Sequence, residues 1–154
     1  MNVPFKRPVV AVLGASLLLL AACSPSASGD AGGGGSTVDI TLQEFAVIAS
    51  ETSAPAGEIT FSVTNDGPDD VHEFVIVQTD LEPGDLPTDE HGTVDESGEG
   101  MEVIDEIEDL PVGETQEVTV ELEAGSYVLL CNIFDATEDE AHYAEGMRSA
   151  FTVE

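Results

Sequence analysis

Apolar and polar residues alternate along short segments of the chain from residue 37 onward, and Gly, Pro and Asn lie between these segments. An alternation with a period of two places every second side chain on the same face of a β-strand. The segment at 74–77 is apolar throughout, as expected for a strand that is covered on both faces. We predict six strands, at residues 38–42, 59–63, 74–77, 117–122, 126–131 and 151–153. Short strands at this spacing indicate an all-β fold of the β-sandwich type.

Two segments of the domain interrupt the strand pattern. Residues 81–100 combine many acids with several Gly and Pro residues, which predicts a solvated loop. This loop contains His91, and a lone histidine in an acidic loop is interpreted as a surface residue. Residues 134–141 are also acidic, but they lack the alternating acids and central Gly of an EF-hand loop. The sequence therefore argues against that kind of calcium site.

The N-terminal segment has the features of a secretory signal. Lys6 and Arg7 precede an almost entirely apolar run at 9–22, which falls short of the roughly 20 apolar residues that a membrane-spanning helix needs. The sequence Leu-Ala-Ala-Cys that ends at Cys23 resembles the lipobox of bacterial lipoproteins. We therefore predict a signal peptide at 1–22 and a lipid group on Cys23.

The rest of the chain divides into a tether and one domain. Residues 23–36 consist mainly of Gly, Ser and Ala, a composition that is typical of a flexible linker. Residues 37–154 are long enough for one ordinary domain with its own core. We expect a secreted protein whose lipid holds it on the outer face of the cell membrane.

The chain is strongly acidic, with 32 Asp and Glu residues, 3 Lys and Arg residues and a formal net charge of −29. Removal of the signal takes away two of the three cations and no acid, which leaves Arg148 alone and a charge of −31. Such a surface repels nucleic acid. It suits either hydration at high salt or the steering of a basic redox partner, such as a cytochrome or an oxidase. The even spread of the acids favours the first interpretation.

Four residues near the ends of predicted strands carry metal-binding chemistry. His72 precedes the third strand, Cys131 ends the fifth, and His142 and Met147 lie between the fifth and the sixth. If Cys23 carries a lipid, Cys131 has no cysteine left for an intramolecular disulfide. A thiolate, two imidazoles and a thioether form the ligand set of blue-copper electron-transfer sites. Strand parity places these residues at the ends of rows of inward-facing apolar side chains, and so at one pole of a sandwich.

Two stretches of the sequence surround the four candidate ligands. In the first, Thr60-Phe-Ser-Val-Thr-Asn65-Asp-Gly leads to His72-Glu-Phe-Val. In the second, Gly125-Ser-Tyr-Val-Leu-Leu-Cys131 is followed by His142, Gly-Met147 and Phe-Thr-Val. Together they resemble the cupredoxins, the blue-copper family of plastocyanin and azurin. The resemblance implies a Greek-key β-sandwich of seven or eight strands with one type 1 copper ion. It also implies that His72, Cys131 and His142 are the strong equatorial ligands and Met147 the weak axial one.

The sequence departs from the family pattern in two places. Ten residues separate Cys131 from His142, where family members usually have two to four. The additional residues either bulge outward, since loop closure costs little more in a longer loop, or mark a site that has loosened or been lost. Many relatives follow the first histidine with an Asn that links the ligand loops, but here the residue is Glu73. Asn132 and Asn65 are candidates for that role.

Three functions follow from these residues. The first is a membrane-anchored protein that carries single electrons at a type 1 copper site. The second is a copper carrier or buffer without a redox role, and the third is a metal-free interaction domain that keeps the fold alone. An enzyme is not expected, because the sequence contains no Ser-His-Asp or Cys-His-Asn grouping with a spare base. The glycines at 32–35 are not followed by the Lys of a phosphate-binding loop.

Overall fold

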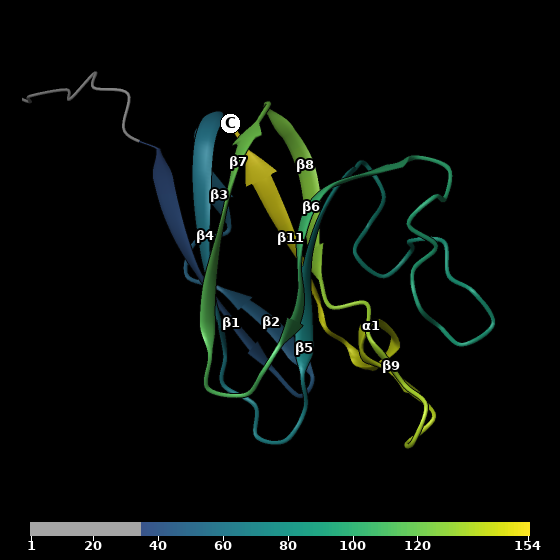
Figure 1. Cartoon of the computed structure of the whole chain (residues 1–154). Coiled ribbons are helices and arrows are strands. Elements are labelled where there is room, and N and C mark those ends of the chain that lie inside the picture. Colours follow the sequence, from purple (N-terminus) through teal and green to yellow (C-terminus); the bar gives the residue numbers. More distant parts are fainter. Residues whose placement is uncertain (1–34) are drawn as a thin grey trace, which may run out of the picture. The chain divides into compact units, whose positions relative to one another are not determined.

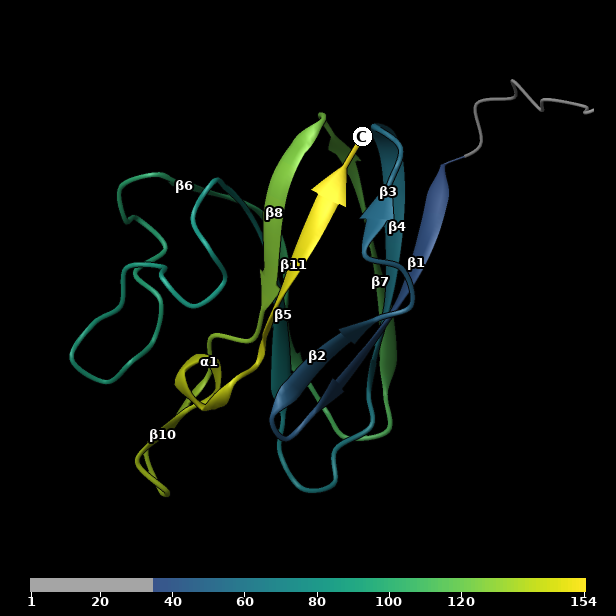
Figure 2. The ribbon, with the colours of Figure 1, turned by 180° about the vertical axis from the view of Figure 1, so that it is seen from behind.

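The computed structural model describes residues 35–154 (Figures 1 and 2). The predicted signal at 1–22, the lipid on Cys23 and nearly all of the tether at 23–36 lie outside the described residues and stay predictions. Within 35–154, no helix is long and apolar enough to cross a bilayer.

The described part of the chain is almost entirely β. Its single short helix, α1, spans His142–Glu145. The strands are β1 Ser36–Gln43, β2 Ala46–Ala49, β3 Ser53–Ala54, β4 Gly57–Asn65, β5 His72–Thr79, β6 Met101–Leu110, β7 Thr115–Leu122, β8 Gly125–Leu130, β9 Phe134–Asp135, β10 Glu140–Ala141 and β11 Arg148–Val153.

Two sheets pack face to face. One has the order β2-β1-β4-β7 and the other β3-β11-β8-β5-β6, while β9 and β10 form a separate two-stranded ribbon. The pairs β1–β4 and β3–β11 are parallel and the remaining pairs are antiparallel. The predicted all-β sandwich is confirmed. In the described chain the two sheets hold nine strands, where the family resemblance implied seven or eight and the alternation predicted six. The short β2 and β3 and the longer, largely acidic β6 were not recognised in the sequence.

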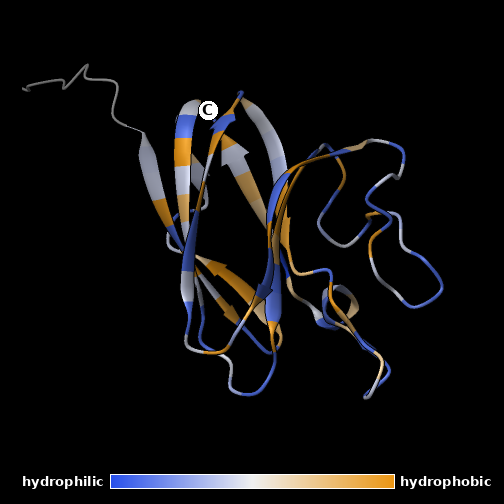
Figure 3. Ribbon diagram, viewed as in Figure 1, coloured by the Kyte–Doolittle hydropathy of each residue, from blue (hydrophilic) through white to orange (hydrophobic). Residues whose placement is uncertain are grey.

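The core between the sheets follows from the alternation of β1 and β4. In β4 the side chains of Ile59, Phe61 and Val63 are completely buried, while the polar residues between them are half-buried. Figure 3 shows how apolar and polar residues are distributed along the strands. Phe61 contacts Phe74 of β5 and Phe151 of β11, with ring centroids 5.6 and 5.5 Å apart. Each fully buried aromatic side chain contributes roughly 2–3 kcal/mol. These rings therefore hold one sheet against the other.

A second apolar cluster covers the outer face of the larger sheet. Its strand residues are Val75, Val77, Val128 and Leu130. Leu86 and Val94 of the segment at 81–100 cover these side chains, and each is only 5% exposed. The prediction that 74–77 is covered on both faces is therefore confirmed. The prediction of a solvated loop at 81–100 is wrong for these two residues, because two apolar anchors suffice to fix an otherwise acidic loop to a sheet.

Tyr143 of α1 ties the same loop to the segment that carries His142. Its hydroxyl group donates a hydrogen bond to the carbonyl of Pro83 at 2.7 Å and accepts one from the N–H of Leu86 at 3.3 Å. The guanidinium of Arg148 lies over the Tyr143 ring, 4.9 Å from its centroid. The loop and α1 thus form one packed layer beside the pole at which β5 begins.

Candidate metal centre

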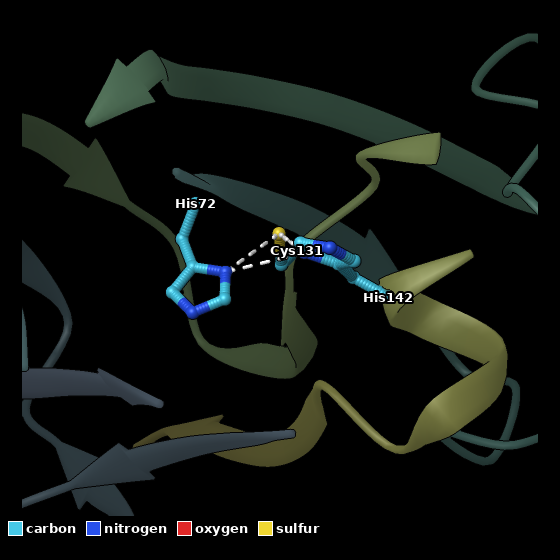
Figure 4. Close-up of side chains that lie close together, drawn as sticks. All are labelled: His72, Cys131 and His142. Carbon is cyan, nitrogen blue, oxygen red and sulfur yellow. Dashed lines mark hydrogen bonds between the residues drawn. The ribbon is translucent and has the colours of Figure 1, made fainter. Parts of the chain in front are cut away.

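Three of the four predicted ligands converge in a buried cluster (Figure 4). The Nδ1 atoms of His72 and His142 lie 3.2 Å apart. The sulfur of Cys131 lies 3.4 Å from Nδ1 of His142 and 3.9 Å from Nδ1 of His72. All three side chains are 1% exposed or less. The structure therefore presents two nitrogens and one sulfur to a common point.

The sheet brings His72 and Cys131 together. Strands β5 and β8 are antiparallel neighbours, and Val75 pairs with Leu130, so the start of β5 lies beside the end of β8. The backbone N–H of Glu73 donates a hydrogen bond to the Cys131 sulfur at 3.2 Å. Two adjacent strands thus fix two of the ligand side chains without any contribution from a long loop.

Met147 lies beside the cluster through its backbone. Its carbonyl accepts a hydrogen bond from the N–H of Cys131, and its own N–H donates to the carbonyl of His142, both at 3.0 Å. The Met147 side chain is completely buried in the same apolar cluster as Cys131. Its role as an axial ligand stays a prediction.

The ten residues between Cys131 and His142 form an outward hairpin. Strands β9 and β10 pair Phe134 with Ala141 and extend away from the sandwich in both views (Figures 1 and 2). The N–H of His142 donates to the carbonyl of Ile133 at 2.9 Å, which closes the base of the hairpin. His142 therefore reaches the cluster as it would after a short loop. The outward bulge is the arrangement that the structure adopts.

The two asparagines considered as cross-links have other roles. Asn65 is fully buried; it donates to the carbonyls of Asp70 and Leu110 at 2.8 and 2.9 Å and accepts from the N–H of Gly67 at 2.8 Å. These bonds shape the turn that leads to His72. Gly67 has a φ of 51°, a left-handed conformation that glycine adopts without strain.

Asn132 joins the ligand segment to the 81–100 loop. Its side chain exchanges two hydrogen bonds with the backbone of Val94, at 2.6 and 3.1 Å. The link between the segments of His72 and Cys131 is made by Glu73 instead. Its backbone N–H donates a hydrogen bond to the Cys131 sulfur. Glu73 thus supplies the link for which Asn65 and Asn132 were the candidates.

Burial disfavours the charged form of each of the three side chains in the cluster. Burial raises the pKa of the Cys131 thiol to about 11, although N–H donors from Glu73 and Ile133 oppose the shift. Burial also lowers the pKa of His72 and of His142. A cation that binds here must displace the thiol proton, so its affinity is expected to fall in acid.

One carboxylate near the cluster was not predicted from the sequence. Oε1 of Glu44, in the turn between β1 and β2, lies 3.7 Å from Nε2 of His72. No signal in the sequence separates Glu44 from the other acids of this chain.

His91, the third histidine, is 51% exposed at its side chain and lies against Phe134, with ring centroids 4.7 Å apart. It is not a member of the cluster, as expected for a surface histidine.

A hollow of about 390 Å³ opens beside His142. Its wall combines acidic and apolar side chains and includes His142 itself. The other lining residues are Asp69, Asp70, Val71, Ile133, Phe134, Asp135 and Ala136. The described surface therefore reaches one side of the cluster through the hairpin and the turn before β5.

The donor atoms fit copper. A soft thiolate with two imidazoles matches the His₂Cys set of blue-copper centres, which accept a weak thioether as a further ligand. Structural zinc sites use four strong ligands drawn from Cys, His and carboxylates, whereas the described cluster offers three. The buried Met147 beside Cys131 is consistent with the copper set.

Comparisons with known proteins identify the fold. No family model matches the sequence, and no curated protein gives a significant match. Among solved structures, auracyanin from the photosynthetic bacterium Roseiflexus castenholzii is 24% identical, with 79% of this chain and 99% of that one covered and a TM-score of 0.54. Auracyanin A from Chloroflexus aurantiacus, described as a "blue" copper protein, is 21% identical, with 79% and 100% covered and a TM-score of 0.52.

Rusticyanin from Thiobacillus ferrooxidans is 18% identical, with 79% of each chain covered and a TM-score of 0.50. Identities this low show similarity of fold rather than of activity. The two sheets, their strand order and these matches agree with one another. The chain has the cupredoxin fold.

Proposed function

We propose that this protein is an extracytoplasmic electron carrier, anchored to the membrane through a lipid on Cys23, with one type 1 copper site. His72, Cys131 and His142 would hold the ion as its strong ligands, and Met147 would be the weak one. The observation that carries the proposal is the convergence of two Nδ1 atoms and one sulfur, from three separate segments, in a fully buried cluster.

The residues around the cluster suit repeated one-electron transfer. A copper ion bound there would supply the redox couple between Cu(I) and Cu(II). Because β5 and β8 fix His72 and Cys131, the ligand geometry changes little when the charge changes. The N–H of Glu73 donates to the sulfur and stabilises its thiolate form. Burial keeps water away from the ligand atoms.

The hollow beside His142 is the proposed route to a redox partner. The carboxylates of Asp69, Asp70 and Asp135 line it together with apolar side chains, which suits a partner with a basic face, such as a cytochrome or an oxidase. The alternative interpretation of the acidity, hydration at high salt, predicts that these three acids contribute no more to electron transfer than acids elsewhere on the surface.

A copper titration tests the proposal. The protein without residues 1–23 is titrated with Cu(II), its visible spectrum is recorded, and ascorbate is then added. An intense thiolate-to-copper band that disappears on reduction supports the electron carrier. Bound copper that cannot be cycled identifies a carrier or buffer, and no Cys131-dependent binding identifies a metal-free interaction domain. Cys131→Ser should abolish the band, while His91→Ala, the matched control outside the cluster, should leave it unchanged.

A further inference from the structure

Glu44 comes from the sheet opposite to the one that carries His72. It lies in the turn between β1 and β2, and its side chain is only 12% exposed. Oε1 accepts hydrogen bonds from the N–H groups of Asp69 and Asp70, at 3.1 and 2.7 Å. Oε2 is buried and has no hydrogen-bond partner among the residues that the structure describes. The turn before β5 thus holds this carboxylate in place with one oxygen unused.

His72 also has a buried polar atom without a hydrogen-bond partner. Its Nδ1 faces Cys131 and His142, while its Nε2 is buried and also lacks a hydrogen-bond partner within residues 35–154. The nearest charged group to Nε2 is Glu44, with Oε1 at 3.7 Å. A buried donor without an acceptor is costly, and a buried carboxylate oxygen without a donor is costly too. A small shift of either side chain would bring Nε2 of His72 within hydrogen-bond distance of the Glu44 carboxylate.

A carboxylate near Nε2 affects how the imidazole of His72 binds a metal. A histidine that binds a metal through Nδ1 must carry its proton on Nε2, and an acceptor at Nε2 fixes both the tautomer and the orientation of the ring. A carboxylate acceptor also makes the imidazole a stronger donor. No backbone carbonyl within residues 35–154 accepts a hydrogen bond from Nε2 of His72, so Glu44 is the group placed to select the tautomer.

We propose that Glu44 is the positioning residue for His72. Its carboxylate accepts the Nε2–H of His72, directs the Nδ1 lone pair toward Cys131 and His142, and adds a negative charge next to the metal centre. The inference rests on the proposed function, since it concerns the same site. The negative charge of Glu44 would stabilise Cu(II) relative to Cu(I), because the site with Cu(II) carries one more positive charge.

Two variants separate the hydrogen bond from the charge. Glu44→Gln keeps the shape and an accepting oxygen but removes the charge, whereas Glu44→Ala removes both. Asp66→Asn is the matched control, because it removes an exposed carboxylate from the turn before β5, the turn whose N–H groups Glu44 accepts from, without touching His72. All variants are made in the full-length chain, purified in detergent, and their folding is checked by thermal unfolding.

The first readout uses the protein without metal. Nitrogen NMR of the imidazoles should show His72 as the Nε2–H tautomer in the wild type, in Glu44→Gln and in Asp66→Asn, and as a mixture of tautomers in Glu44→Ala. An unchanged Nε2–H tautomer in Glu44→Ala would overturn the positioning role. This readout needs no copper, so it decides the role of Glu44 even if the wild type binds no copper and the proposed function fails.

The second readout is the reduction potential of the copper-loaded protein. Glu44→Gln should raise the ratio of Cu(I) to Cu(II) affinity by about tenfold, which is about 59 mV for a one-electron couple. Its Cu(II) affinity should fall by roughly 10- to 100-fold, as for other residues that orient a metal ligand. A potential equal to that of Asp66→Asn would overturn the electrostatic part of the proposal. If Glu44→Ala does not fold, Glu44→Gln alone decides this part.

Discussion

The two histidines of the cluster have the same exposure but very different surroundings. His72 begins a central strand, follows a turn that Asn65 holds by three hydrogen bonds, and has the fixed carboxylate of Glu44 at its outer nitrogen. His142 begins a four-residue helix after a projecting hairpin, and it borders a hollow in the surface. One ligand is thus held by the sandwich and the other by loops.

This difference indicates that the two histidines contribute to the site in different ways. The His72 side chain is completely buried after a turn held by hydrogen bonds, and this side is suited to setting metal affinity and reduction potential. The side of His142 is open to a partner and rests on segments that can differ in length, because the hairpin closes at its base. The comparison is tested below by changes to each side, in order of decreasing expected effect.

The largest expected effect separates the histidines directly. His72→Gly and His142→Gly should each lower copper affinity by at least ~100-fold, since each removes a ligand. Added imidazole should restore the visible band only in His142→Gly, because the hollow gives the small molecule a path to that position. Both variants are titrated with Cu(II) with and without imidazole. Equal rescue of the two variants would show that imidazole reaches the His72 side as well.

The turn before His72 should contribute strongly to stability. Asn65→Ala leaves the N–H of Gly67 and the carbonyls of Asp70 and Leu110 without their buried partner. We expect the free energy of unfolding to fall by about 3 kcal/mol, measured by urea denaturation. The neighbouring Thr64→Ala removes an exposed hydrogen bond to Thr115 and should cost less than about 1 kcal/mol. Equal losses would contradict the special role of this turn.

Glu73, which links the segments of His72 and Cys131, should make the stability of the protein depend on pH. Burial, and then repulsion from Glu106 and Glu96, raises the pKa of Glu73 from its ordinary value of 4.5 to about 7. Between these values the folded protein holds a proton that the unfolded chain has lost, so stability declines as pH rises through this range. Glu73→Gln should remove that decline and stabilise the protein at pH 8 by roughly 1–2 kcal/mol, after allowance for partial exposure.

Thermal unfolding at pH 4.5 and at pH 8 measures this effect. Glu58→Gln, which changes an exposed carboxylate at the start of β4, is the control and should not alter the pH dependence. The same decline in wild type and Glu73→Gln would place the titrating group elsewhere.

The hairpin beside His142 should matter least to the site. Replacement of residues 136–139 by Asn-Gly keeps the pairing of β9 with β10 and shortens only the turn. Because loop closure depends weakly on length, we expect less than about 1 kcal/mol of change in stability and an unaltered copper band. Loss of the band would mean that the turn, rather than the base at Ile133, positions His142.

Much of the fold could be predicted from the sequence. The alternation in β1, β4 and β7 determines which side chains face the core, and the apolar run at 74–77 predicts a strand with two covered faces. The anchoring of the 81–100 loop could not be predicted, because Leu86 and Val94 are two apolar residues among many acids. Strands as short as β2 and β3 contain too few residues to show a period.

The cluster of His72, Cys131 and His142 followed from residue chemistry and strand parity. The spacing alone left open whether His142 reaches the others, since only the pairing of Phe134 with Ala141 brings the two ends of the insertion together. Glu44 could not be found at all, because its role depends on a contact between two sheets. In a chain with 32 Asp and Glu residues, no local pattern distinguishes Glu44 from the others.

The most direct test of the account is a crystal structure of the copper-soaked protein with anomalous diffraction recorded at the copper edge. The account predicts one strong peak within bonding distance of Nδ1 of His72, Nδ1 of His142 and the Cys131 sulfur, with the Met147 sulfur as a longer axial contact. A peak bound by surface carboxylates alone, or no peak at the cluster, would contradict the assignment of a type 1 copper site.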